Sequence, residues 1–393
     1  MKILTVNAGS SSLKFNVIEL PEQKELISGY FQRIGIDGSF YYVKINGEKT
    51  EHQIELKNHI DAVECLKKEL FDNNIISSLD EIDGVGHRLV HGGDKFKTSV
   101  LINDEVLSEC EKFNELAPLH NPPMLACVKA FMEALPNTPM VAVFDTSFHQ
   151  SMEEEEYIYP VPYEWYLKYG VRKYGFHGTS HKFINKTISE VLGRDDLKVI
   201  SCHLGSGASI CAIDSGKVKD TSMGFSPLAG LMMGTRSGDI DESLIPYIVN
   251  KTGKSYDEVF EDLNKNSGFL GVSGVSSDSR DIEDGAKEGN KRCILAQNIF
   301  NQRVANYIAQ YNNLLNGADV IVFTAGLGEN SIDTRLGIGN RIASLGVKID
   351  EEANNMRGKL QKISKEDSKI PVYVVPTNEE LMIALDTYEL INK

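Results

Sequence analysis

The sequence predicts an α/β protein made of two related halves, and three observations lead to this expectation. The chain has 393 residues, which is too long for one compact core and suits two domains of ordinary size. A strand, a Gly/Ser-rich loop and a second strand occur at residues 3–18 and again at residues 199–213. In the later half, strands alternate with helical segments, which favours a sheet that binds its ligand at the carboxyl ends of its strands.

The two hairpins share the features of a phosphate-binding loop. The first joins its strands through residues 7–12 and the second through residues 203–209. Glycine leaves backbone N–H groups accessible to a phosphate, and nearby hydroxyls and amides supply further donors. The repeat therefore predicts a duplicated domain with one phosphate-binding hairpin in each half.

The middle of the chain holds the expected junction between the halves. Residues 140–144 are uniformly apolar and predict a buried strand that ends at Asp145. An acidic run at residues 153–156 follows, and we interpret it as a solvated face.

Later elements follow from apolar periodicity. Residues 290–316 have apolar positions at helical spacing and predict a helix, with Gly317 as its C-cap. Strands are expected at residues 320–323 and 372–375, each followed by a polar loop and a helix.

The start of the last helix carries a local signal. Thr377 and Glu380 have the spacing of a capping box, which assigns Glu380 to the helix end. This interpretation leaves Glu379 available as an oxygen ligand for Mg²⁺ or for its bound waters.

Composition excludes several classes of protein. Hydrophobic residues make up 41% and charged residues 25% of the chain, and no stretch has the ~18–20 apolar residues of a membrane helix. The net charge of −15 disfavours an extended nucleic-acid surface, although a local Arg/Lys cluster is enough for a small anion. The six cysteines are scattered without a CxxC pair, so reduced thiols are expected. The N-terminal segment lacks targeting features, and the expected location is the cytoplasm.

Familiar nucleotide motifs do not fit. No GxGxxG follows the first strand. Gly253-Lys254-Ser255 resembles the end of a P-loop, but Ile248 stands where the motif needs glycine, and a helical segment precedes it.

Histidine spacing raises and then disfavours a zinc site. His87 and His91, and again His177 and His181, have i,i+4 spacing. No HExxH glutamate accompanies them, and the Gly-rich surroundings argue against a helix at either pair. We expect some of these histidines to donate to phosphoryl oxygens instead.

Two arginines stand out as anion ligands. Arg88 lies in GHRLVHGG at residues 86–93, and Arg236 lies in GTRSGD at residues 234–239. Arginine holds carboxylate or phosphoryl oxygens through two parallel hydrogen bonds, so both are candidate substrate ligands.

Nine ordered segments together carry a resemblance to one family. They are NAGSSSLKF at 7–15, GHRLVHGG at 86–93, APLHNPP at 117–123, VFDTSFH at 143–149, YGFHGTSH at 174–181, HLGSGAS at 203–209, GTRSGDID at 234–241, TAGLGENS at 324–331 and PTNEEL at 376–381. Through them the chain closely resembles the acetokinase family, within the sugar kinase/Hsp70/actin superfamily. The resemblance implies two duplicated ribonuclease-H-like domains with a nucleotide cleft between them, the actin-like ATPase fold. It implies an N-terminal domain at 1–147, completed by a helix at 381–393, and a C-terminal nucleotide-binding domain at 148–380.

The resemblance also implies an activity. The expected reaction is reversible, Mg²⁺-dependent transfer of the ATP γ-phosphoryl group to acetate, giving acetyl phosphate and ADP, with Mn²⁺ as an alternative metal. A homodimer is implied, with no nucleic-acid or membrane partner. Two alternatives stay open: a propionate or butyrate kinase of the same superfamily, and a non-catalytic ATP-binding module of the actin or Hsp70 type.

Single residues receive roles only through this resemblance. The implied catalytic residues are Asp145, Arg236, His177 and Arg88, with His177 and Arg236 stabilising the transition state. The implied metal ligands are Asn7 and Glu379. Arg88 is implied to bind the carboxylate, and the implied apolar pocket for the methyl group consists of Val90, Leu119, Phe176 and Pro227. His120 is implied to line the same region.

The nucleotide is implied to contact both hairpin loops and two later segments. These residues are Asn7, Ser10, Ser12, Lys14, His203, Leu204, Gly205, Ser206, Gly207, Asp278, Ser279, Arg280, Gly326, Gly328 and Asn330. One position departs from the family pattern, which usually reads HLGNGAS where this chain has HLGSGAS, with Ser206 in place of asparagine. We expect this change to alter nucleotide affinity without abolishing the reaction.

Overall fold

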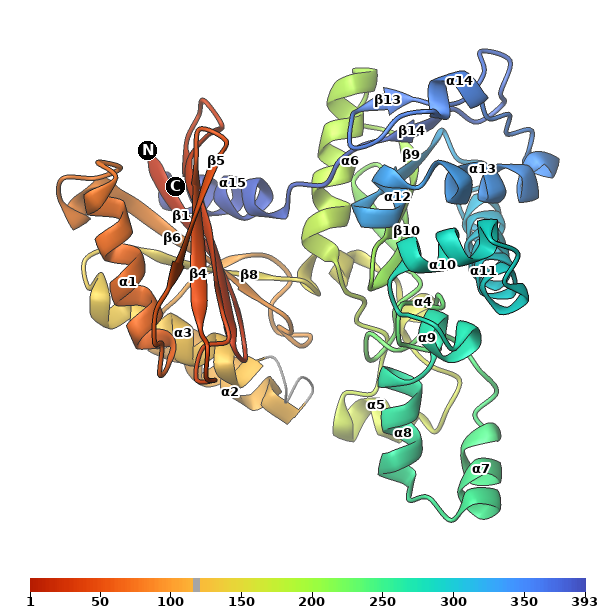
Figure 1. The fold of residues 1–393 in the computed structure, drawn as a ribbon, viewed down its shortest axis with the longest axis horizontal. Helices are drawn as coiled ribbons and strands as arrows, with labels where there is room; N and C mark the ends of the chain where they lie inside the picture. The colour runs from red at the N-terminus through yellow and green to blue at the C-terminus, as the bar shows by residue number, and fades with distance from the viewer. Residues whose placement is uncertain (116–120) are drawn as a thin grey trace. The chain divides into compact units, whose positions relative to one another are not determined.

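The chain folds into two compact units. The structure, a computed structural model, describes all residues except 116–120 (Figure 1). One unit consists of residues 1–148 and 378–393, and we call it the N-unit. The other, the C-unit, consists of residues 149–377. The chain therefore leaves the N-unit, forms the whole C-unit, and returns to the N-unit for its last helix.

The N-unit is built on an eight-stranded mixed sheet. Its strands are β1 (Lys2–Gly9), β2 (Ser12–Glu19), β3 (Lys24–Gln32), β4 (Phe40–Ile45), β5 (Glu48–Gln53), β6 (Ile82–Leu89), β7 (Val100–Leu101) and β8 (Met140–Phe144). They lie in the order β5-β4-β3-β2-β1-β6-β8-β7. β1, β6 and β8 run parallel, and the remaining neighbours pair antiparallel.

The C-unit repeats this arrangement. Its strands are β9 (Lys198–Leu204), β10 (Ala208–Asp214), β11 (Lys217–Thr221), β12 (Val320–Thr324), β13 (Gln361–Lys362) and β14 (Val372–Val374). Their order is β11-β10-β9-β12-β14-β13, with β9, β12 and β14 parallel and the other pairs antiparallel. Order and direction match β3-β2-β1-β6-β8-β7 strand for strand. The expected α/β fold with a duplicated domain is confirmed.

Helices complete each unit. The N-unit has α1 (His59–Asp72), α2 (Asp104–Lys112), α3 (Asn121–Ala134) and α15 (Glu379–Ile391). The C-unit has α4 (Glu154–Tyr157), α5 (Tyr163–Tyr169), α6 (Gly178–Leu192), α7 (Leu244–Thr252), α8 (Tyr256–Lys265), α9 (Gly268–Ser273), α10 (Ser279–Lys287), α11 (Lys291–Leu314), α12 (Ala325–Asn330), α13 (Ile332–Arg341) and α14 (Glu351–Asn354). None of the helices in the described part of the chain is long and apolar enough to span a membrane.

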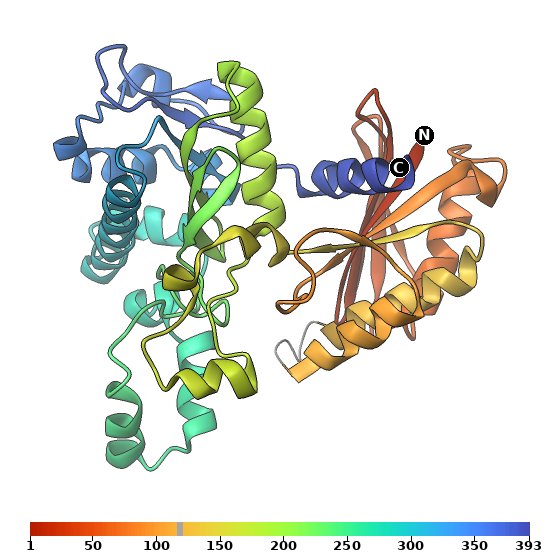
Figure 2. The ribbon, with the colours of Figure 1, turned by 180° about the vertical axis from the view of Figure 1, so that it is seen from behind.

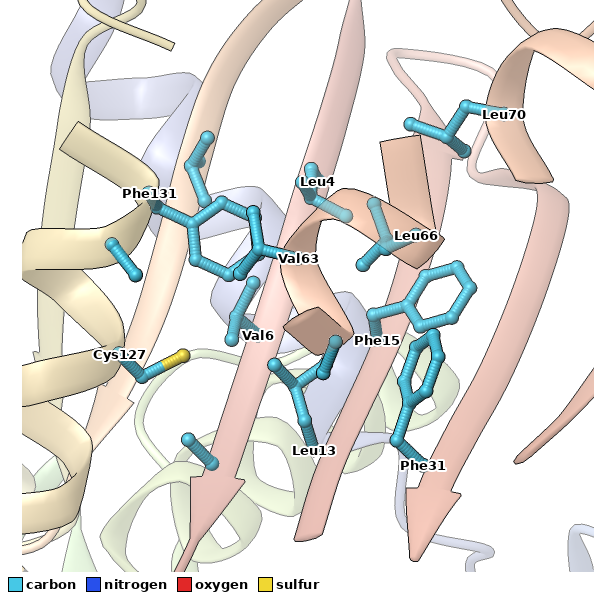
Figure 3. Packing of buried hydrophobic residues seen from close by; sticks show 14 of the residues in the cluster. Leu4, Val6, Leu13, Phe15, Phe31, Val63, Leu66, Leu70, Cys127 and Phe131 are labelled. Carbon is cyan, nitrogen blue, oxygen red and sulfur yellow. The ribbon is translucent and has the colours of Figure 1, made fainter. Parts of the chain in front are cut away.

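Both faces of the N-unit sheet are buried. Leu4 and Val6 of β1 belong to the cluster that α1 and α3 cover, which Figure 3 shows from close by. Ile3, on the opposite face because side chains alternate along a strand, packs instead with Ala384 of α15. Figure 2 shows α15 lying against this sheet beside both chain termini. β1 is therefore buried continuously from Ile3 to Val6, as is typical of a central strand covered on both faces.

Most expected elements are confirmed, and two local predictions need correction. Both hairpins form, as do the strands expected near 140, 320 and 372. The long helix ends at Leu314, and Leu315 is its C-cap. Gly317 follows with φ +97° and donates its N–H to the Asn312 carbonyl, so it closes the helix end without being the cap.

The predicted capping box at Thr377 and Glu380 is wrong. α15 begins at Glu379, and its N-cap is Asn378, whose side chain accepts the Leu381 N–H at 3.0 Å. Glu380 instead forms an ion pair with Lys14. The rejected P-loop is an ordinary turn between helices, with Gly253 ending α7 and Ser255 capping α8.

Candidate active site

In the N-unit, three polar residues lie at one edge of the sheet. Asn7 is near the end of β1, Arg88 is near the end of β6, and Asp145 directly follows β8. Because these strands are parallel neighbours, their carboxyl ends meet at the same edge. This is the edge at which open α/β sheets bind their ligands.

Arg88 is held in one orientation by its neighbours. Its Nε donates to Asp145 Oδ1 at 3.0 Å, its Nη2 donates to Asp145 Oδ2, and its Nη1 donates to Asn7 Oδ1 at 3.1 Å. The Asp145 side chain is only 4% exposed. Burial lowers the pKa of the Arg88 guanidinium, but the negative charges of Asp145 and Glu379 raise it by more, so the pKa lies above its ordinary value. Asp145 is thus an orienting partner of Arg88 in this structure.

Glu379 has the properties expected of a cation ligand. Burial raises the pKa of its carboxyl group, Arg88 and Lys14 act against the rise, and Glu380 adds to it. A divalent cation would compensate this carboxylate. Among the residues the structure describes, no cluster of three or more His, Cys, Asp or Glu side chains forms a ready-made metal site. Mg²⁺ usually takes only one or two carboxylates together with phosphates and water, so the residues fit that ion.

The remaining N-unit predictions differ in their surroundings. Ser10 and Lys14 are exposed at the first hairpin and Ser12 is half-buried, while Val90 is buried beyond the end of β6. Leu119 and His120 lie outside the described residues.

In the C-unit, the second hairpin brings together His177, His203 and Gly207. His177 is the N-cap of α6, with φ +56°, and its ring stacks on His203 at a centroid distance of 4.2 Å. His181 lies in the first turn of α6, so the expectation of no helix at this pair was wrong. The expectation holds for His87 and His91, since β6 contains His87 and ends before His91.

Arg236 and His177 converge on one point beside Gly207. A Cβ built on Gly207 would lie 3.4 Å from His177 Nε2 and 3.6 Å from Arg236 Nη1. Arg236 Nη1 donates to the Pro227 carbonyl at 3.4 Å, and in the part of the chain that is described no carboxylate pairs with this guanidinium. Burial lowers the pKa of Arg236. A partly buried cation without a carboxylate partner among the described residues suits an anionic ligand.

Phe176, the other apolar pocket residue predicted in the C-unit, is 4% exposed. Its carbonyl accepts a hydrogen bond from His149 Nε2 at 2.8 Å. The backbone just before His177 is therefore fixed.

A cavity of about 540 Å³ opens in the C-unit beside the second hairpin. Seven residues predicted to bind the nucleotide line it: Gly205, Ser206, Asp278, Ser279, Arg280, Gly326 and Asn330. No atom lies within 4 Å of a Cβ built on Gly326, so this glycine faces open space. Asp278 caps α10 and pairs with Arg280, which lowers the pKa of Asp278 to about 2.

The cavity also contains residues that the sequence did not reveal. They are Gly234, Phe269, Ser277, Glu283, Leu327, Ser331 and Arg357. Of the nucleotide residues predicted in the C-unit, four do not line it: His203, Leu204, Gly207 and Gly328. The Gly328 carbonyl instead accepts from Arg335, a fully buried arginine that also donates to the backbone oxygens of Asn354 and Met356. Arg335 thus ties α12 to the segment that carries Arg357.

The duplicated fold, the cavity and the uncompensated arginine define a kinase of the actin-like ATPase fold. The sequence matches the acetokinase family over residues 2–385. A protein from a Geobacillus species named acetate kinase is 54% identical over 100% of this chain and 99% of its own. A crystal structure of Porphyromonas gingivalis acetate kinase has a TM-score of 0.95 and 45% identity, covering 99% of both chains. A propionate kinase structure from Francisella tularensis has a TM-score of 0.94 and 41% identity, with the same coverage of both chains. The chain belongs to the acetokinase family, whose members transfer a phosphoryl group to a carboxylate.

Proposed function

We propose that this chain catalyses the reversible, Mg²⁺-dependent transfer of the ATP γ-phosphoryl group to acetate, giving acetyl phosphate and ADP. The observation that carries the proposal is the convergence of Arg236 and His177 beside Gly207, with no carboxylate of the described residues neutralising Arg236. Donors fixed in this way suit the equatorial oxygens of a transferring phosphoryl group. The names of the full-length relatives support acetate as the acceptor.

In the proposed reaction, an acetate oxygen attacks the γ-phosphorus in line, and the bond to the oxygen bridging to the β-phosphorus breaks. The carboxylate is already ionised, so the step needs no general base. Arg236 and His177 bind the oxygens on which negative charge is spread, and Arg88, oriented by Asp145, binds the carboxylate. The C-unit cavity holds the nucleotide. Glu379 and Asn7 would hold Mg²⁺, which supplies charge neutralisation between the phosphates when bound.

The direct test is capture of the acyl phosphate as its hydroxamate. Purified protein with ATP, Mg²⁺ and acetate should form acetyl hydroxamate, and omission of either ATP or Mg²⁺ should abolish it. ATP hydrolysis without any hydroxamate, or ATP binding without turnover, would instead support a non-catalytic module and overturn the proposal.

Propionate is the second candidate acceptor, because a structure named propionate kinase is as similar in fold as the acetate kinases. Val90 lies two residues beyond Arg88 and is 5% exposed, so it is the variant to test. If Val90 limits the acyl pocket, Val90→Ala should lower the KM for propionate and leave acetate equal or poorer. A methylene is worth only about 1–3 kcal/mol of discrimination in an apolar site. A lower melting temperature with an unchanged acetate-to-propionate ratio of kcat/KM would make Val90 a core residue only.

We also propose that the protein acts as a homodimer in the cytoplasm. Exposed large hydrophobic side chains concentrate on α5, α7 and α8 of the C-unit, including Trp165, Leu167, Tyr247, Tyr256 and Phe260. Exposed apolar surface of this density is typical of an interface. All six cysteines are free and five of them are buried, which suits a reducing compartment.

The dimer can be tested by light scattering, which should give twice the chain mass for the wild type. The double variant Leu167→Glu, Tyr247→Glu should give the mass of the monomer, and a monomeric wild type would contradict the dimer.

A further inference from the structure

The face of the second hairpin that contacts α6 carries three polar side chains close together. Ser201 and His203 are two apart on β9, and Ser209 of β10 pairs directly with His203. Because side chains alternate along a strand and opposite residues share a face, all three project to the same side. α6 packs against β9 and places His177, Ser180 and His181 over this side.

Hydrogen bonds connect these residues in a chain that includes His177. Ser201 Oγ lies 2.8 Å from His181 Nδ1, His181 Nε2 lies 2.8 Å from Ser209 Oγ, and Ser209 Oγ lies 2.9 Å from His177 Nδ1. Ser201, His181 and Ser209 are each 0% exposed. Bulk water therefore does not reach the links behind His177.

The central histidine is neutral in these surroundings. Burial lowers the pKa of His181 well below its ordinary value, and the nearby His149 and His203 lower it further. A neutral imidazole has one ring nitrogen that donates and one that accepts. Ser209 could accept from both histidines, but its buried hydroxyl hydrogen would then have no acceptor among the described residues. Ser209 therefore donates to one histidine and accepts from the other.

Two directions are compatible with the heavy-atom positions, and they have opposite consequences for His177. In the first direction, His181 donates to Ser201, and Ser209 donates to His181 and accepts from His177 Nδ1. The hydrogen of a neutral His177 is then on Nδ1, and its bare Nε2 cannot donate to a phosphoryl oxygen. If Ser201 donates to His181, then His181 donates to Ser209, and Ser209 donates to His177 Nδ1. The hydrogen of a neutral His177 is then on Nε2, the nitrogen that approaches Gly207 beside Arg236.

We propose that Ser201, His181 and Ser209 are positioning residues that hold His177 as its Nε2–H tautomer, aimed at the phosphoryl group. This inference rests on the proposed function, because the choice between the two directions depends on the phosphoryl group that His177 is proposed to bind. The chain of hydrogen bonds supplies an N–H donor without a carboxylate behind the histidine. A carboxylate in that place would reduce the net positive charge that the phosphoryl group meets.

The tautomer can be measured directly in the intact protein. ¹⁵N chemical shifts of histidine-labelled enzyme distinguish a ring nitrogen that carries hydrogen from one that does not, and the His177→Gln spectrum assigns the signal. We expect His177 to carry hydrogen on Nε2 with Nδ1 bare, and Ser209→Ala to mix the two tautomers. Hydrogen on Nδ1 of His177 in the resting wild type, in a neutral or a cationic ring, would overturn the proposal.

Kinetics separate positioning from a purely structural role. Ser209→Ala should lower kcat about 10- to 100-fold, the loss found when a partner that orients a metal-ligating histidine is removed, with the KM values for ATP and acetate nearly unchanged. Ser209→Thr keeps the hydroxyl and should restore kcat, and Ser201→Ala should give a smaller loss in the same direction. The matched control is Ser222→Ala, since this buried serine accepts from the Ile210 N–H at 2.9 Å and has no link to His177.

Equal kcat losses in Ser209→Ala and Ser222→Ala, or a normal kcat in Ser209→Ala, would overturn the positioning role. If the wild type makes no acyl phosphate at all, the proposed function fails, and the ¹⁵N measurement still decides the tautomer.

Discussion

Two arginines that are both proposed to bind anionic oxygens stand in opposite electrostatic surroundings. Arg88 is paired through two hydrogen bonds with a nearly buried Asp145, whereas Arg236 has only a carbonyl and a thioether as partners among the described residues. Removal of Arg88 leaves a buried carboxylate without its cation, and removal of Arg236 leaves no charge behind. The two residues should therefore separate activity from stability.

We expect Arg88→Ala and Arg236→Ala each to reduce kcat by about 10²–10³-fold, because each removes a preorganised cation. Arg88→Ala should also lower the free energy of unfolding by roughly 2–4 kcal/mol, since it leaves the buried carboxylate of Asp145 without its cation. Arg236→Ala should leave stability unchanged or slightly improved. Urea unfolding and turnover of both variants test this; equal stability losses would contradict the assigned surroundings.

Glu379 gives a prediction with a defined pH dependence. Burial raises its folded-state pKa above the unfolded value, so the unfolded chain releases this proton first as the pH rises. The ionised Glu379 therefore destabilises the folded state. This destabilisation is absent below about pH 4, the pKa of the group in the unfolded chain, and reaches its full value above the folded-state pKa. Glu379→Gln should therefore raise the melting temperature of the ligand-free protein at neutral pH by about 1–3 °C, with the gain disappearing in acid.

Glu379→Gln should also raise the Mg²⁺ concentration needed for half-maximal activity. Glu380→Gln is the control, since its partner Lys14 is half exposed and such pairs contribute little. A stabilised Glu380→Gln, or an unchanged Mg²⁺ requirement in Glu379→Gln, would show that the wrong glutamate was chosen.

At the scale of elements, the hairpins were predictable and the cap of α15 was not. Apolar strands around Gly/Ser loops leave few other conformations, so both hairpins followed from the sequence. The spacing of Thr377 and Glu380 satisfies the capping-box pattern, but Asn378 competes one residue later and asparagine is the stronger N-cap. The chain does contain a true capping box, at Ser255 and Glu258, where the next residue is Tyr256, which has no capping preference.

We expect Asn378→Ala to lower the free energy of unfolding by about 1 kcal/mol, because it removes the acceptor for the Leu381 N–H. Thermal unfolding of Asn378→Ala and Asn378→Ser measures this, with the serine variant retaining most of the stability. A full loss in Asn378→Ser would argue against a capping role.

At the scale of the molecule, the nucleotide cavity was only half predictable. Gly205, Ser206, Gly326 and their companions belong to motifs with a recognisable pattern. Phe269, Glu283 and Arg357 come from α9, α10 and a loop, and they reach the cavity through tertiary packing that leaves no local signal. Arg335 holds the start of that loop by donating to the carbonyls of Asn354 and Met356, and no sequence pattern predicts this role.

The division of the N-unit between the two ends of the chain predicts the effect of truncation. α15 covers the sheet face that holds Ile3, Val141 and Val143. A chain ending at Thr377 should lose the cooperative unfolding of the N-unit and all turnover, while its C-unit still binds ATP. Addition of a peptide of residues 378–393 tests whether the missing helix is sufficient; a normal N-unit in the truncated chain would contradict the argument.

The late position of α15 also has a consequence during synthesis. About 245 residues separate the end of the first N-unit segment from the chain terminus. At translation rates of about 5–20 residues per second, the ribosome takes roughly 10–50 s to deliver them. Throughout that time the sheet face around Ile3 has no helix to cover it, and a nascent chain offers apolar strands to any chaperone that binds such surface. The N-unit therefore cannot be completed before α15 has left the ribosome, so a chain terminated before α15 would be recognised as unfolded before it could ever consume ATP.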